Sequence, residues 1–230
     1  MIIAATSDIH SPRYLNQFFQ SFNGLKDIKV DLFLLAGDLS EKGEFNHFYP
    51  VYSAVKKYKT VAVFGNEDFQ DKREFYKKHY PEIIWLEDEK VDININGVSI
   101  SIVGSDGVLR EPTKWQKLNG MDEEYYRKKR EIIEELLCEA KGELKILLTH
   151  YASSYSTIVG ERKEIFPQLG DRVIEEAKCL PNIAIHGHAH YAKVTFSVVR
   201  NVKVYNVALP ANKKIVLIRL SDLEVTPRIS

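Results

Sequence analysis

The sequence predicts an α/β fold in which two β-sheets pack together with helices on the outside. Three patterns lead to this prediction. Short apolar runs alternate with helical segments over the first 80 residues, a segment of alternating polar and apolar residues follows, and the last forty residues form consecutive strand-like runs. No internal repeat, low-complexity tract or linker interrupts the 230 residues, so we expect a single domain over residues 1–230.

The first part of the chain predicts a parallel sheet with crossover helices. Apolar runs at 2–6, 32–36 and 61–64 are short and continuous, as in strands buried on both faces. Helical segments at 11–25, 45–58 and 70–79 alternate with them, and the first opens with Ser11-Pro12, a good helix start. This β-α-β-α-β-α order is typical of parallel strands.

The pattern changes in the middle of the chain. Residues 91–103 alternate and carry Asn96-Gly97, a strong hairpin signal. We then expect, in order, a charged amphipathic helix over 121–141, a buried strand over 143–150, a loop or flap over 151–165, a helix over 168–179 and a strand over 182–185. Short runs at 192–199, 202–208, 213–220 and 223–227 predict an antiparallel sheet at the end of the chain.

Composition excludes several classes of protein. Lys plus Arg and Asp plus Glu both number 32, so net charge gives no reason to expect nucleic acid or an anionic membrane as the main partner. No apolar run approaches the roughly 18 residues of a membrane span, and the N-terminus lacks the basic region of a signal peptide. Cys138 and Cys179 alone do not make a disulfide scaffold, so we expect a reducing, cytoplasmic location.

Polar residues follow the buried runs where each ends. They are Ser7-Asp8-Ile9-His10, Gly37-Asp38, Gly65-Asn66-Glu67-Asp68, Thr149-His150 and His186-Gly187-His188-Ala189-His190. Each piece alone has an ordinary interpretation as a helix cap or a turn. The carboxyl ends of parallel strands lie along one rim, however, where ligands bind. We therefore expect these side chains to meet at one site.

In these five blocks the sequence resembles the calcineurin-like metallophosphoesterase superfamily, in particular its small prokaryotic-type phosphodiesterases. The signature of that superfamily is Asp-x-His, Gly-Asp, Gly-Asn-His-Asp/Glu, a lone His after a strand, and Gly-His-x-His. Four blocks are complete here, and the match runs from Asp8 to His190. The resemblance implies a four-layer α/β/β/α sandwich of two mixed sheets flanked by helices.

The resemblance also implies a dinuclear metal site. Asp8, His10 and His190 would hold one ion, Asn66, His150 and His188 the other, and Asp38 would bridge the two. Oxygen and imidazole ligands without a thiolate suit Mn²⁺, which we favour, or iron, zinc, cobalt or nickel. Two such ions would lower the pKa of a bridging water, and the resulting hydroxide would attack phosphorus.

One block departs from the superfamily pattern. Glu67 stands where the signature has a histidine that contacts the phosphate and assists the leaving group. A carboxylate there repels a phosphate dianion, so we expect a preference for phosphodiesters and assign Glu67 and Asp68 as catalytic residues. The arginine that follows the block in protein phosphatases is Phe69 here, so those enzymes are a poor analogy.

The remaining histidines and arginines are expected to lie outside the site. His186 falls outside the signature and is interpreted as structural, and His47 and His79 as surface residues. Arg110 and Arg162 are possible phosphate contacts, but an unpaired surface arginine is the commoner case.

The leading hypothesis is a metal-dependent phosphodiesterase acting on a small-molecule phosphoester. A nuclease of the same superfamily is an alternative, although the balanced charge disfavours nucleic acid. A non-catalytic interaction module with this fold is another, which the intact ligand positions disfavour. No membrane partner is expected, and the sequence leaves the oligomeric state open.

Overall fold

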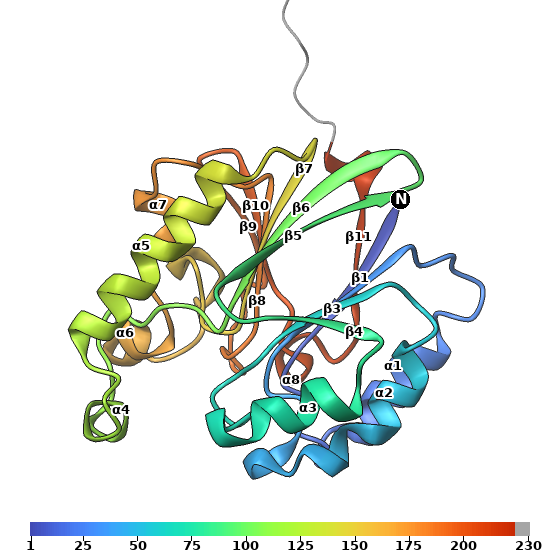
Figure 1. The fold of residues 1–230 in the computed structure, drawn as a ribbon, viewed down its shortest axis with the longest axis horizontal. Coiled ribbons are helices and arrows are strands. Elements are labelled where there is room, and N and C mark those ends of the chain that lie inside the picture. Colours follow the sequence, from blue (N-terminus) through green and yellow to red (C-terminus); the bar gives the residue numbers. More distant parts are fainter. Residues whose placement is uncertain (224–230) are drawn as a thin grey trace, which may run out of the picture.

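The computed structural model of the protein describes residues 1–223 and contains two mixed β-sheets packed face to face (Figure 1). Helices cover the outer faces, so the predicted α/β/β/α sandwich is confirmed. The five-stranded sheet has the order β11-β1-β2-β3-β4, with β1 at Ile2–Thr6, β2 at Leu32–Ala36, β3 at Thr60–Val63, β4 at Ile83–Leu86 and β11 at Val216–Arg219. Strands β1 to β4 are parallel, and β11 is antiparallel to β1.

The second sheet has six strands in the order β5-β6-β7-β8-β10-β9. Their bounds are Glu89–Ile95 (β5), Val98–Ser105 (β6), Leu144–Thr149 (β7), Ile183–His186 (β8), Phe196–Val199 (β9) and Val202–Asn206 (β10). The predicted hairpin is confirmed, since β5 and β6 are antiparallel and Asn96 and Gly97 have φ values of 53° and 86°. Strands β6, β7, β8 and β10 run parallel.

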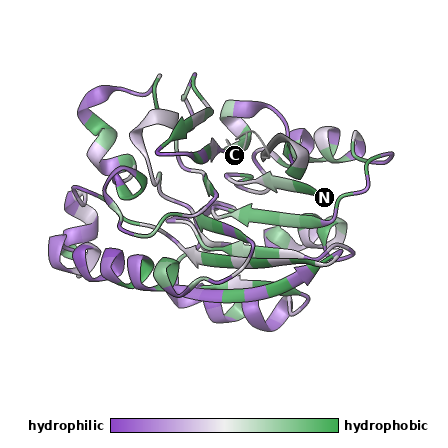
Figure 2. Ribbon diagram, turned by 90° about the horizontal axis from the view of Figure 1, so that it is seen from above, coloured by the Kyte–Doolittle hydropathy of each residue, from purple (hydrophilic) through white to green (hydrophobic). Residues whose placement is uncertain are grey.

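The continuous apolar runs arise because the strands are buried on both faces. In β2, Leu32, Leu34 and Ala36 face the core between the sheets, whereas Phe33 and Leu35 face the helices. Every residue of this strand is buried. Figure 2 shows the same distribution, with hydrophobic strands inside and hydrophilic segments on the outer helices.

Two groups of helices form the outer layers. Helices α1 (Leu15–Asn23), α2 (Tyr49–Val55) and α3 (Arg73–His79) pack on the five-stranded sheet. Helices α5 (Glu123–Glu139) and α7 (Val173–Glu176) pack on the six-stranded sheet. Shorter helices are α4 (Lys114–Leu118), α6 (Phe166–Leu169), α8 (Leu209–Asn212) and the 3₁₀ segments η1 (Glu41–Gly43), η2 (Phe45–Phe48), η3 (Gln70–Lys72), η4 (Tyr155–Thr157), η5 (Lys163–Ile165) and η6 (Leu220–Leu223).

The prediction of a helix over 168–179 is wrong. The chain there forms only α6 and α7, separated by Gly170. Gly170 pairs with Ala152 in an isolated bridge, and a Cβ atom at Gly170 would lie 2.1 Å from the Ala152 carbonyl oxygen. This pairing with a distant segment interrupts the helix.

The prediction of one antiparallel sheet at the end of the chain is also wrong. Strand β10 is antiparallel to β9 but parallel to β8, and β11 leaves for the other sheet to pair with β1. Residue 223 lies in η6, and 224–227 of the fourth predicted strand lie outside the described residues. Strand β4 and helix α4 were not predicted from the sequence.

Cys138 and Cys179 form a disulfide, which the sequence analysis did not expect. The bond joins the end of α5 to the segment after α7, because both elements pack on the same sheet. The expectation of a reducing, cytoplasmic location rested on unpaired cysteines, and the two cysteines are paired here. A cytoplasmic location therefore stays a prediction. Among the described residues, no helix has the length and apolar character needed to cross a membrane.

Candidate metal centre

Five parallel strands deliver polar side chains to one rim of the sandwich. Strands β1, β2, β3, β7 and β8 each end immediately before, or within a few residues of, a predicted site residue. Asp8, His10, Asp38 and His188 have φ values of 55°, 40°, 52° and 67°. Positive φ is uncommon for residues other than glycine and concentrates at functional sites, because the surrounding structure has to hold it.

Two glycines allow the strand ends to approach closely. A Cβ atom at Gly65 would lie 2.1 Å from Asp38 Oδ1, and one at Gly187 would lie 2.5 Å from Asp8 Oδ2. Neither position accepts a larger residue without displacing a site carboxylate. These glycines are therefore needed for close packing of the strand ends.

Asp8, His10 and His190 form the first group of side chains. His190 Nε2 lies 2.8 Å from Asp8 Oδ1, and His10 Nε2 lies 3.9 Å from the same oxygen. One ligand atom from each residue falls within 4.8 Å of the others. Such distances suit three ligands around one ion with bonds of about 2.0–2.2 Å.

Asn66, His150 and His188 form the second group. His150 Nε2 lies 3.0 Å from Asn66 Oδ1 and 3.1 Å from His188 Nδ1. The other nitrogen, His150 Nδ1, lies 2.9 Å from the carbonyl oxygen of Ala36. Since a carbonyl only accepts, Nδ1 carries the proton and Nε2 presents its lone pair to the group.

Asp38 lies between the two groups. Its Oδ2 atom is 3.7 Å from His10 Nε2 and 3.5 Å from His150 Nε2. Its Oδ1 atom accepts a hydrogen bond from the backbone N–H of Glu67 at 2.7 Å. One oxygen is thus held by the backbone, and the other remains for ions on both sides.

The two carboxylate oxygens of Asp8 also have separate roles. Its Oδ2 atom accepts hydrogen bonds from Ser7 Oγ at 2.5 Å and from the backbone N–H of His188 at 3.0 Å. Its Oδ1 atom faces the histidines. Bonds to ligating carboxylates of this kind orient the free oxygen.

The charges at the site are unbalanced without cations. Burial raises the pKa of Asp38, and the negative charges of Asp8 and Asp68 raise it further, to well above its usual value. Burial and the neighbouring His150 lower the pKa of His188 to about 3, so this imidazole is neutral. Both ring nitrogens of His10 are buried without a hydrogen-bond partner among the described residues. Clustered carboxylates, the neutral imidazole of His188 and the orphaned nitrogens of His10 fit two divalent cations.

Glu67 and Asp68 occupy different environments. The Glu67 side chain is 31% exposed, and its Oε2 atom lies 3.5 Å from His10 Nδ1 and accepts from the Lys42 N–H at 3.1 Å. Asp68 is fully buried and accepts from the Gly65 N–H at 2.9 Å and from Tyr76 Oη at 3.1 Å. These contacts suit Asp68 to hold the loops around the site, and a catalytic role for either residue stays a prediction.

The other singled-out residues lie away from the two groups. His186 is buried, and its Nε2 atom lies 2.7 Å from Thr157 Oγ1, which agrees with a structural role. His47 and His79 are exposed, as expected. Arg110 is held by Asp171 and Glu176 at 2.5 and 2.7 Å, so its charge is already paired.

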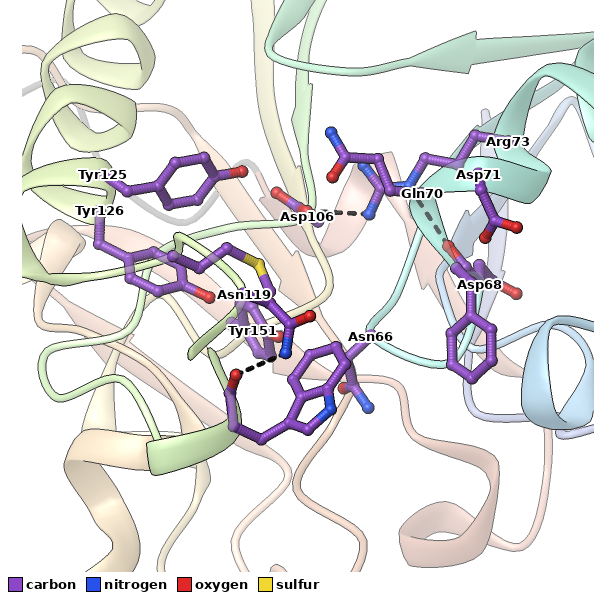
Figure 3. A pocket seen from close by; sticks show the side chains of 13 residues that line it. Asn66, Asp68, Gln70, Asp71, Arg73, Asp106, Asn119, Tyr125, Tyr126 and Tyr151 are labelled. Atoms are coloured by element: carbon purple, nitrogen blue, oxygen red, sulfur yellow. Dashed lines mark hydrogen bonds and ion pairs between the residues drawn. The ribbon is translucent and has the colours of Figure 1, made fainter. Parts of the chain in front are cut away.

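Two cavities adjoin the candidate metal centre. The smaller, of about 380 Å³, is lined by Asn66, Glu67 and His188 among others. The larger, of about 600 Å³, lies between α3 and α5, and Figure 3 shows Tyr125 and Tyr126 on the side opposite Arg73 and Gln70. The cavities share four lining residues, Asn66, Phe69, Trp115 and Tyr151.

The aromatic wall of the larger cavity was not predicted from the sequence. Trp115 lies on α4, which begins with a capping box formed by Thr113 and Gln116. The Thr-x-x-Gln spacing was a usable signal for this helix. Nothing in the local sequence indicated that α4 faces Tyr125 and Tyr126 of the next helix.

The family comparison gives one match over most of the chain. The sequence profile described as calcineurin-like phosphoesterase matches residues 1–192. No curated protein matches the chain by sequence.

Several solved structures share the fold. One superposes with a TM-score of 0.63 at 16% identity, covering 96% of this chain and 95% of its own. The NAD nucleotidase of Haemophilus influenzae has a TM-score of 0.57 at 16% identity, with 95% of this chain and 49% of that chain covered. A purple acid phosphatase from yellow lupin (Lupinus luteus) has a TM-score of 0.53 at 14% identity, with 92% and 44% covered. At these identities the likeness concerns the fold alone.

Proposed function

The chain belongs to the calcineurin-like phosphoesterase family, and from this premise we propose that it is a dinuclear metal-dependent phosphoesterase that prefers phosphodiesters. The phosphoesterase activity follows from the family. We propose in addition that the site holds two ions, that the seven residues named above are their ligands, and that the enzyme prefers diesters.

The observation that carries the dinuclear site is the position of Asp38. Its Oδ2 atom lies 3.7 Å from His10 Nε2 and 3.5 Å from His150 Nε2, one imidazole nitrogen from each group. A single ion does not require a carboxylate shared in this way. The ligands would be Asp8, His10 and His190 for one ion, Asn66, His150 and His188 for the other, and Asp38 for both.

The residues of the chain have distinct tasks around this centre. Two divalent ions bound by these residues would polarise phosphoryl oxygens and lower the pKa of a water molecule. Asp38, held through Oδ1 by the Glu67 N–H, orients the centre. Donors of this type favour Mn²⁺ or a related first-row ion, because no thiolate is present.

Metal content and turnover test this proposal together. The purified protein should take up about two ions per chain and hydrolyse bis(p-nitrophenyl) phosphate only when loaded. Loaded protein that turns over neither this diester nor p-nitrophenyl phosphate would instead support the non-catalytic module.

Three histidine variants test the division of ligands. His188→Ala should mainly empty the site formed with Asn66 and His150, and His190→Ala the site formed with Asp8 and His10. His186→Ala is the control and should leave both sites filled, because its ring bonds to Thr157. The measurement is metal stoichiometry of the three variants beside the wild type. Equal metal loss in His186→Ala would refute the proposed division.

Glu67 is the basis for the proposed preference for diesters. Its carboxylate lies 3.5 Å from a His10 nitrogen and lines the smaller cavity together with His188. A monoester dianion bound at the centre carries one more negative charge near this group than a diester. At about 5 Å and an effective dielectric constant of about 20, that extra charge costs roughly 3 kcal/mol, and less where solvent penetrates.

Glu67→His should shift specificity towards monoesters. We expect the diester-to-monoester ratio of kcat/KM to fall by about tenfold to a hundredfold, equivalent to about 1–3 kcal/mol. Glu67→Gln removes the charge without supplying an acid, so it should relieve the discrimination but slow esters with poor leaving groups. The measurement is kcat/KM for matched p-nitrophenyl mono- and diesters.

Glu44→Gln is the control for these variants, since Glu44 lies in the neighbouring loop and lines neither cavity. The diester-to-monoester ratio of kcat/KM in Glu44→Gln should equal that of the wild type. A ratio that is also unchanged in Glu67→His would show that Glu67 does not act on the substrate.

A further inference from the structure

The larger cavity continues the candidate metal centre into the space between α3 and α5. Asn66, assigned above to one ion, lines both cavities, and so does Tyr151, which follows His150 in the chain. A group attached to a phosphorus at the centre can therefore extend into about 600 Å³ of space. A volume of this size holds a small organic ligand.

Five of the thirteen residues that line this cavity are aromatic. The five are Phe69, Trp115, Tyr125, Tyr126 and Tyr151. Trp115 is 59% exposed and Phe69 is 40% exposed, although large aromatic residues are usually covered. Both stand where the two cavities meet, so their open faces are available to a flat group next to the reacting phosphorus.

Contacts support helix α4, which carries Trp115, and the Phe69 ring. Gln116, beside Trp115 on α4, closes the capping box with Thr113 and donates from Nε2 to Tyr151 Oη at 3.1 Å. The Phe69 ring packs against Gly43, where an added Cβ would lie 2.7 Å from a ring carbon. Rings held in place lose little freedom when a ligand stacks on them.

Charge in the cavity favours a neutral occupant. Arg73 is paired with Glu87 at 2.9 Å and with Asp106 at 3.0 Å, so its charge is balanced. The side-chain amide of Gln70 has no hydrogen bond among the described residues, and Asn119 uses only its Nδ2 atom, on the Trp115 carbonyl. Figure 3 shows Gln70 and Asn119 on different sides of the cavity. These amides offer donors and acceptors to the edge of a polar ring.

We propose that the larger cavity binds the nucleoside part of a nucleotide phosphoester, with the base stacked on Trp115. This inference rests on the proposed function, because it names the class of ester brought to the metal centre. Flat aromatic faces, amides with spare hydrogen-bonding capacity and the absence of an unpaired cation among the described lining residues fit a nucleobase better than an aliphatic chain or a second phosphate.

Binding of nucleosides without phosphate tests the cavity separately from the chemistry. Adenosine and thymidine should quench the fluorescence of wild-type protein, and D-ribose should not. The quenching should disappear in Trp115→Phe, because the other tryptophan, Trp85, is 8% exposed and stacks on Phe64 in the core. Calorimetry should show about tenfold to a hundredfold weaker binding in Trp115→Ala. Leu118→Ala is the matched control on the same helix, since Leu118 is 77% exposed and lines neither cavity.

Two matched esters test whether the cavity also contributes to binding during catalysis. Methyl p-nitrophenyl phosphate and the p-nitrophenyl ester of thymidine 5′-phosphate have the same charge and the same leaving group. Wild-type protein should prefer the nucleoside ester at least tenfold in kcat/KM, chiefly through KM. Trp115→Ala should lose this preference, whereas Leu118→Ala should keep both the preference and the wild-type kcat for the methyl ester.

The outcomes separate the two proposals. Turnover of both esters without preference, together with no nucleoside quenching, would overturn the nucleoside cavity and leave the phosphoesterase standing. Nucleoside binding that depends on Trp115, with no turnover of either ester, would support the cavity and overturn the proposed catalytic function. Binding that is unchanged in Trp115→Ala would overturn the cavity.

Discussion

Asp38→Ala should lose both metal ions and lower kcat/KM by at least about a thousandfold, or roughly 4 kcal/mol of transition-state stabilisation. The reason is that Asp38 Oδ2 lies between His10 and His150, one from each ligand group. The measurement is metal content and bis(p-nitrophenyl) phosphate turnover beside the wild type.

Folding should survive this substitution. Asp8, Asp38 and Asp68 are three buried carboxylates, and removing one reduces the repulsion among them in the metal-free protein. The metal-free variant should therefore melt no lower than the metal-free wild type. Added Mn²⁺ should raise the melting temperature of the wild type only, because binding to the folded state alone stabilises it. Two ions per chain in Asp38→Ala would refute the bridging role.

Lys129→Met should lower the free energy of unfolding by about 3–5 kcal/mol at neutral pH. The Lys129 side chain is 7% exposed, and its Nζ atom lies 2.6 Å from Asp88 Oδ2 and 2.5 Å from Asp106 Oδ1. Methionine keeps much of the apolar stem but leaves the two carboxylates without this cation. Denaturant titration gives the difference in stability.

The loss of unfolding free energy in Lys129→Met should depend on pH. Burial alone would raise the pKa of Asp106, but Lys129 and Arg73 outweigh it and hold this pKa below its ordinary value. A carboxyl group with a lowered pKa in the folded state stabilises the fold above its unfolded pKa of about 3.9, and this stabilisation is lost as the pH falls through the folded value. The difference in unfolding free energy between the wild type and Lys129→Met should therefore be largest near pH 7 and should become smaller below pH 4.

Lys128→Met is the matched control for Lys129→Met. Lys128 precedes Lys129 on α5, its side chain is 66% exposed, and it lies 3.5 Å from Glu124. Exposed pairs of this kind contribute little to stability, so the control should unfold close to the wild type at both pH values. Equal losses in the two variants would mean that the buried ion pair is not the cause.

Local patterns predicted the strands that carry the site. The five apolar residues of β2 indicated burial on both faces, and Asp38 was expected near its end for that reason. The order of helices and strands indicated parallel pairing, which brings carboxyl ends to one rim. The seven expected ligand residues do lie together at that rim, although their metal binding stays a prediction.

Other features depend on which distant segments meet, and local patterns do not contain that information. Gly170 pairs with Ala152, which interrupts a stretch whose own composition favours a helix. Strand β11 pairs with β1 across almost the whole chain, although its sequence resembles that of the strands before it. The disulfide forms because α5 and the segment after α7 pack on one sheet.

The sequence by itself determined the strand pattern and the residues at the strand ends, because hydrophobic periodicity and turn-forming residues act over a few positions. The family resemblance implied that Asp38 bridges two ions, but only the tertiary structure decided its distances to both ligand groups and placed Trp115 and Phe69 at a cavity beside Asn66. The physical reason is that distances between side chains on different strands follow from sheet packing and close backbone approach. Gly65 against Asp38 is one such approach, and no spacing along the chain encodes it.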